Sequence, residues 1–213
     1  MNQNRWLGSR VSQICGIIGL FGCISAIVSD IIGIIVVEEH NPISETISSL
    51  AITKYAWIQD TGLDLFAFSI IACAIALSRW QVNSITWKLG TLALFLLGID
   101  IVLIAEHNKY AGREGVGASI HFQCVIALAI LFTLATLLLA FELRKVGRSW
   151  YRYTMGTAIF WLVLAPIFFV MPTKIDGAYE RFLALIMISW VAAISWLLIQ
   201  QGKGKLTYAT QTI

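Results

Sequence analysis

The chain has 213 residues, of which 58% are hydrophobic and only 13% are charged, and its mean hydropathy is +0.80. A soluble globular domain carries about 25% charged residues, so this composition excludes an ordinary soluble protein and indicates a chain that folds in lipid. The net charge of +3 is unremarkable, and the sequence contains no nucleic-acid-binding or nucleotide-binding motif. We therefore expect no nucleic-acid partner.

Six apolar stretches are long enough to cross a bilayer, which needs roughly 20 residues of helix. They cover about 11–37, 58–78, 87–105, 117–140, 150–171 and 178–199. They do not alternate polar and apolar residues as membrane barrel strands do, and a helix satisfies its own backbone hydrogen bonds in lipid. The sequence predicts an all-α fold, a polytopic bundle of six transmembrane helices forming one integral membrane domain over 1–213. The first stretch is longer than the apolar core of a signal peptide, so we expect it to be retained.

The longest loop, 38–57, contains a predicted short helix of its own. Asn41 followed by Pro42 is typical of a helix start, because Asn accepts from free N–H groups and Pro suits the first turn. One apolar face then recurs at Ile43, Ile47 and Leu50. We predict a short interfacial helix over about 42–51, between the first two membrane helices, with Ser48 on its polar flank.

The 15 basic residues divide unequally between the two sides of this topology. Ten fall on the side that holds both termini, and five fall on the other side. Basic residues concentrate in the cytoplasm. We therefore expect a protein of the plasma (inner) membrane with cytoplasmic N- and C-termini, and with the loops 38–57, 106–116 and 172–177 facing outward.

Four ionisable residues lie inside the predicted membrane helices: Asp30, Asp64, Asp100 and His121. At a rise of 1.5 Å per residue, they lie at similar depths below the outer helix ends. An ionisable group in a bilayer is costly, so it normally faces the bundle interior and has a partner. We predict that the four form a polar site, an outward-open chamber among the first four helices. A structural hydrogen-bond network is the alternative that the sequence leaves open.

A second set of polar residues at the outer helix ends forms the predicted rim of this chamber: His40, Ser48, Asp60, His107 and Arg181. The tripeptide Glu-His-Asn occurs twice in this set, at 39–41 and at 106–108. Asp60 precedes Asp64 by four residues, which places both on one helix face. Arg181 is a cation that can pair with the acids.

Several classes of function fit such a site. We favour binding or handling of a lipid headgroup, small solute or cation, with membrane lipid as the partner and with no enzymatic activity or cofactor. Membrane carboxylates also serve coupled transporters, although inverted repeats are absent. Metal-assisted lipid hydrolysis is the enzymatic alternative. A catalytic zinc needs three protein ligands, which His121 with Asp64 and either Asp100 or Asp30 would supply, although no HExxH motif is present. A structural or partner-binding role is the remaining class.

Three stretches carry a family resemblance: "HNPISETISSLA" at 40–51, "GVGASIHFQ" at 115–123 and "DGAYERFLALIMISW" at 176–190. Their order and placement resemble the bacterial and archaeal membrane family known as domain of unknown function 998. The resemblance implies six helices, with Pro42, Ile47 and Ser48 in the first loop, His121 opening the fourth helix and Arg181 opening the sixth. The family has no established activity, so it implies no catalytic role. A more remote likeness to DRAM-type six-helix proteins points to lipid or membrane homeostasis.

Overall fold

The computed structural model describes residues 3–80 and 82–204, with side chains from Arg10 onward. Over these residues the chain is helical and contains no strand, which confirms the all-α class. The elements are α1 (Gln3–Val36), α2 (Ile47–Leu50), α3 (Ala56–Ser78), α4 (Ile85–His107), the 3-10 turn η1 (Asn108–Tyr110), α5 (Val116–Leu143), α6 (Arg148–Phe168) and α7 (Asp176–Gly202).

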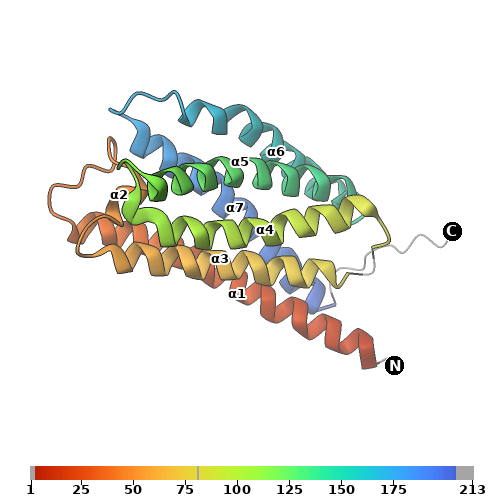
Figure 1. Cartoon of the computed structure of the whole chain (residues 1–213). Coiled ribbons are helices and arrows are strands. Elements are labelled where there is room, and N and C mark those ends of the chain that lie inside the picture. The colour runs from red at the N-terminus through yellow and green to blue at the C-terminus, as the bar shows by residue number, and fades with distance from the viewer. Residues whose placement is uncertain (1–2, 81, 205–213) are drawn as a thin grey trace.

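The long helices form one bundle, with the short α2 at the end opposite both termini (Figure 1). Helix α1 packs against α3 and α7, α4 lies between α3 and α5, and α6 packs mainly on α5. Small residues allow the closest approaches. A Cβ atom at Gly19 would collide with Ser195 in α7, and one at Gly22 would collide with Ser69 in α3. Such small residues are typical of helix contacts in membranes, where lipid gives no hydrophobic drive for helix association.

Five helical segments are long and apolar enough to cross a membrane: Arg10–Val36, Ala56–Ser78, Ile85–Tyr110, Val116–Leu143 and Asp176–Gly202. The predicted fifth span, 150–171, corresponds to α6, which is not among them. Its first turns carry Arg148, Arg152 and polar aromatic residues, which lower the hydropathy of the helix. The chain is therefore a multi-helix membrane protein, and the count of six spans stays a prediction.

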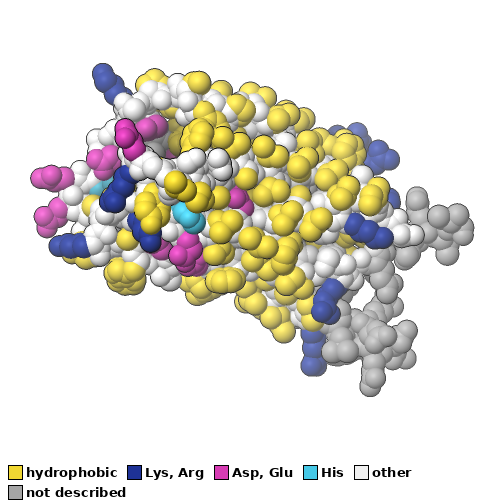
Figure 2. Space-filling view, viewed as in Figure 1, with side chains coloured by type: hydrophobic (Ala, Val, Ile, Leu, Met, Phe, Trp, Pro, Cys, Tyr) yellow, Lys and Arg dark blue, Asp and Glu magenta, His cyan; other side chains and the backbone are white. Residues whose placement is uncertain are grey.

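The surface agrees with burial in lipid. A continuous flank of hydrophobic side chains covers the middle of the molecule (Figure 2). The exposed hydrophobic residues of α1 include Phe21 and Ile24, which are 59% and 60% exposed. Asp and Glu side chains gather at the α2 end, together with some Lys and Arg, whereas the opposite end shows Lys and Arg in this view. The molecule is thus polar at both ends, with the acidic side chains concentrated at the α2 end.

The predicted bounds of the interfacial helix were wrong, because α2 is shorter than 42–51. Thr46 directly precedes α2 and has an extended backbone, with φ −68° and ψ 161°. In a continuous helix the carbonyls of Pro42 and Glu45 would accept from N–H groups one turn later. Both accept instead from the guanidinium of Arg181 in α7, at 2.9 and 2.7 Å. The tertiary contact therefore divides the segment into a turn and a short helix.

Candidate functional site

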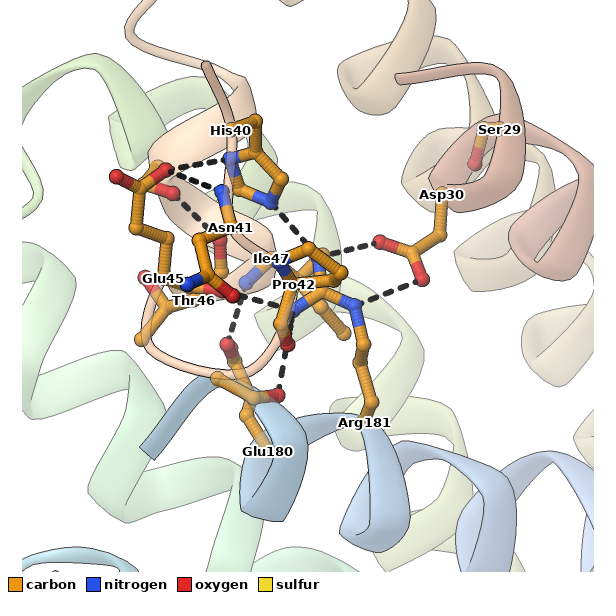
Figure 3. A network of polar contacts seen from close by, with 12 residues as sticks. Ser29, Asp30, His40, Asn41, Pro42, Glu45, Thr46, Ile47, Glu180 and Arg181 are labelled. Atoms are coloured by element: carbon orange, nitrogen blue, oxygen red, sulfur yellow. Dashed lines mark hydrogen bonds and ion pairs between the residues drawn. The ribbon is translucent and has the colours of Figure 1, made fainter. Parts of the chain in front are cut away.

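Arg181 is the centre of a polar network at the α2 end of the bundle (Figure 3). Its Nε and Nη2 donate to the two carboxylate oxygens of Asp30 in α1, at 3.1 and 3.0 Å. Nη2 also donates to Nε2 of His40, at 3.2 Å. Nη1 donates to the backbone carbonyls of Pro42, Glu45 and Gly177. An arginine has five N–H donors, so this guanidinium has no donor left over.

His40 connects Arg181 to Glu45. Its Nδ1 lies 2.8 Å from Oε2 of Glu45, and its side chain is only 2% exposed. Because Nε2 accepts from Arg181, the ring proton of neutral His40 is on Nδ1, where it donates to Glu45. Burial lowers the pKa of His40 below its ordinary value of 6.5; the carboxylates of Glu45 and Asp30 oppose this shift, and the positive charge of Arg181 reinforces it. His40 is therefore neutral near pH 7.

The start of α7 holds the 38–51 loop by backbone contacts as well. The N–H of Ala178 donates to the carbonyl of Ile43 at 2.9 Å. The N–H of Ile47, the first residue of α2, donates to Oε2 of Glu180 at 2.6 Å. Gly177 lies so close to the backbone of Glu45 that a Cβ atom would collide with it. Helix α7 thus fixes the loop over the end of the bundle.

The four residues predicted to form the site are distributed over different interfaces. Asp30 pairs with Arg181. Asp64, in α3, has a buried Oδ1 without a hydrogen-bond partner and lies near the carboxylate of Glu106. Asp100 in α4 and His121 in α5 share the α4–α5 interface. Among the residues that the structure describes, no hydrogen bond or ion pair joins any two of the four, and their functional role stays a prediction.

Asp100 and His121 are both buried, at 7% and 8% exposure. The Asp100 carboxyl lies near the thiol of Cys124, and its Oδ2 has no hydrogen-bond partner. The His121 ring lies near the backbone of Ile104, and its Nδ1 has no hydrogen-bond partner. Each side chain therefore lies at the α4–α5 interface and keeps one polar atom unused.

Two of the other rim residues, Asp60 and His107, have local hydrogen-bond partners. Asp60 accepts a hydrogen bond from the side-chain amide of Asn108, at 3.1 Å. His107 donates from Nδ1 to the carbonyl of Leu103, at 2.8 Å, in the last turn of α4. Ser48 in α2 is buried, with 9% of its surface exposed. Of these three, Ser48 alone faces the interior cavity described next.

A cavity of about 160 Å³ lies inside the bundle, below α2. Helices α1 and α3 to α7 contribute its walls, and most of the lining is apolar, including Trp161, Leu183 and Met187. Its polar lining comprises Asp30, Ser48, Gln59 and Glu180. Gln59 and Glu180 were not predicted from the sequence, although Glu180 lies beside Arg181 in the quoted stretch "DGAYERF". The cavity is therefore apolar with a few polar side chains, two of them carboxylates.

Zinc would need several ligands close together. The described part of the chain contains no group of three or more His, Cys, Asp or Glu that could hold a metal ion. The zinc alternative therefore has no ligand set among these residues.

The helices, the apolar flank and the polar ends together define a membrane-embedded helical protein. The comparisons then specify the family: the model described as "Protein of unknown function (DUF998)" matches residues 20–197. The chain belongs to this family, as the resemblance predicted. No curated protein and no solved structure matches the chain. The comparisons give no support to the likeness to DRAM-type proteins.

Proposed function

We propose that the protein binds a membrane lipid in the cavity between its helices. The polar head lies against α2, and the apolar chain packs among the side chains of the helices. The observation that supports this function is the lining of the cavity, which is mostly apolar but includes four polar side chains. Ligand sites are typically apolar, with a few polar groups that fix orientation.

The proposal also includes six spans, with α6 as the additional one. Helix α6 has 21 residues, about 30 Å at 1.5 Å per residue, which matches a bilayer core. Its side chains Phe160 and Val163 are 64% and 60% exposed, as expected of a helix that faces lipid. With six spans, the side that carries ten basic residues is cytoplasmic, and the α2 end of the molecule faces outward.

Cysteine labelling in intact cells tests this orientation. Glu114 and Ser149 are exposed and lie at opposite ends of α5. We expect a membrane-impermeant maleimide to label Glu114→Cys in intact cells and Ser149→Cys only after the membrane is opened, with the parent protein as background. Labelling of Ser149→Cys in intact cells, with Glu114→Cys protected, would reverse the orientation.

A cavity-filling variant tests lipid binding. Ala184 lines the cavity from α7, so Ala184→Phe places a ring inside it. The neighbouring Leu185 is 54% exposed on the outer face, and Leu185→Phe is the matched control. In native mass spectrometry of delipidated protein titrated with twelve-carbon amphiphiles, we expect saturable one-to-one binding to the parent protein and to Leu185→Phe. Equal binding by Ala184→Phe would disprove the cavity as the site.

A further inference from the structure

We propose that the polar side chains of this cavity select a single-chain amphiphile with an ammonium head and discriminate against an anionic head. This inference rests on the proposed lipid-binding function and specifies its ligand. It follows from the unused hydrogen-bonding capacity, the charge and the size of the cavity.

Gln59 supplies an unused acceptor. It is only 2% exposed, it lines the cavity, and its Oε1 has no hydrogen-bond partner. Leaving a buried carbonyl oxygen unpaired is unfavourable, so native structures normally satisfy it. The oxygen itself exposes almost no surface, so a ligand donor would satisfy it after the Gln59 amide turns by half a turn about its last side-chain bond. A carboxylate or phosphate has only acceptors to offer.

The charges around the cavity favour a cation. Asp30 is neutralised by Arg181, with which it forms a two-point ion pair. Glu180 has one hydrogen bond among the described residues, from the N–H of Ile47. No ion pair joins Glu180 to a cation among the described residues, so in its ionised form these groups carry one net negative charge. An ammonium head would neutralise this charge.

The same geometry disfavours an anionic head. Among the described residues, the cation hydrogen-bonded to the polar lining is Arg181, and its N–H donors are used by Asp30, His40 and backbone carbonyls. An anion would have to displace Asp30 from a paired site, which is strongly unfavourable where a charge is left buried and unpaired. The site therefore differs from a phosphate site, in which the N–H donors of an arginine are free to bind the ligand.

The volume restricts the ligand to a single chain. Sites for drug-sized ligands occupy about 300–1,000 Å³, whereas this cavity has about 160 Å³. A buried cavity of about 150 Å³ in another protein holds one benzene molecule. The space below α2 therefore accommodates the head and the adjoining part of one alkyl chain, but not a two-chain phospholipid.

The test compares dodecylamine, dodecanol and dodecanoate against the full-length protein in nanodiscs at pH 7.5, with Ala184→Phe as the non-specific baseline. We expect dodecylamine to bind at least tenfold more tightly than dodecanoate. The net charge of the chain, +3, would favour the opposite order for non-specific binding. Equal or tighter binding of dodecanoate would overturn the inference.

Two variants assign the selectivity to residues. Glu180→Gln retains an oxygen that can accept from Ile47, so the cap of α2 is preserved while the charge is lost. We expect it to bind dodecylamine and dodecanol equally. Gln59→Leu should weaken both ligands about tenfold, by the loss of one hydrogen bond. Thermal stability, together with the dodecanol binding of Glu180→Gln, shows whether the variants are folded.

The outcomes separate the two proposals. Saturable binding that Ala184→Phe abolishes, but without preference for the amine, contradicts the selectivity alone and leaves lipid binding in place. Binding that Ala184→Phe does not reduce contradicts both. An amine preference that persists unchanged in Glu180→Gln would overturn the assignment of selectivity to this carboxylate.

Discussion

Replacing Arg181 with alanine should destabilise the protein by about 3–5 kcal/mol. Removing one partner of a buried ion pair costs about 3–5 kcal/mol because the other charge is left unpaired. Here the Arg181 and Asp30 side chains retain 15% and 18% exposure, so solvent screening reduces that contribution to about 2–3 kcal/mol. The carbonyls of Pro42 and Glu45 also lose hydrogen bonds, each worth about 1 kcal/mol.

Arg181→Lys separates charge from geometry. Lysine keeps the positive charge beside Asp30 but has three donors in place of the planar five-donor fork. It cannot hold the carboxylate, His40 and two carbonyls at once, so we expect a loss of about 1–2 kcal/mol. We therefore expect stability to fall in the order Arg > Lys > Ala, where the first step reflects the loss of the fork geometry and the second the loss of the charge.

The free energy of unfolding can be measured by titration with SDS in mixed micelles. Hydrogen exchange of the backbone amides of 43–51 should rise in both variants, because the loop loses its attachment to α7. Arg113 is exposed, and Arg113→Ala is the matched control, expected to stay within about 0.5 kcal/mol of the parent. A loss below 1 kcal/mol in Arg181→Ala, or unchanged exchange of the loop, would refute the role of Arg181 as the main attachment.

Three further predictions concern single side chains. Burial lowers the pKa of His40 below 6.5, so the unfolded chain binds more protons there. The contribution of neutral His40 to stability is complete above about pH 6.5 and is lost as the pH falls through the lowered pKa of the folded state. His40→Gln should therefore flatten the decline of Tm on acidification. Gly177→Ala should lower the free energy of unfolding by about 1–3 kcal/mol, because its Cβ would meet the backbone of Glu45. Gly156 lies in open space, so Gly156→Ala should raise the free energy of unfolding by up to about 1 kcal/mol, as measured by thermal unfolding. Asp100→Asn should leave the melting temperature unchanged or raise it, because Oδ2 of Asp100 is buried without a partner; a large loss would show that its charge has a stabilising partner.

The helices could be predicted without knowledge of tertiary contacts, because each apolar stretch is long enough to form a membrane-spanning helix. The predicted start and end of the second span, 58–78, differ from those of α3 by two residues or fewer. The segment 42–51 was harder because its backbone groups are used by residues about 135 positions later in the chain. A local capping signal at Asn41 and Pro42 could not show that Arg181 would take the carbonyls of a continuing helix.

Whether the four ionisable residues meet was harder to predict from the sequence than their depth along the helices. Position along a helix gives the height of a residue in the bilayer, but each residue also turns by about 100° around the axis. Two residues at one height meet only if their helices are rotated toward each other. Asp30 faces α7 and Asp100 faces α5, so equal depth did not bring them into contact. Gln59 was missed because it is uncharged and near the start of a span.

The contrast between Arg181 and Gln59 distinguishes structural from ligand-binding polar groups in this protein. Arg181 has as many partners as donors, so a ligand could bind it only by breaking contacts that hold α1, α7 and the loop together. Gln59 and Glu180 face the same cavity with bonding capacity to spare. The fully bonded network therefore holds the roof of the cavity in place, and the incompletely bonded side chains beneath it are those that a ligand can satisfy. On this reasoning, loss of Arg181 weakens every ligand by loosening the loop, whereas loss of the Glu180 charge changes only which head group is preferred.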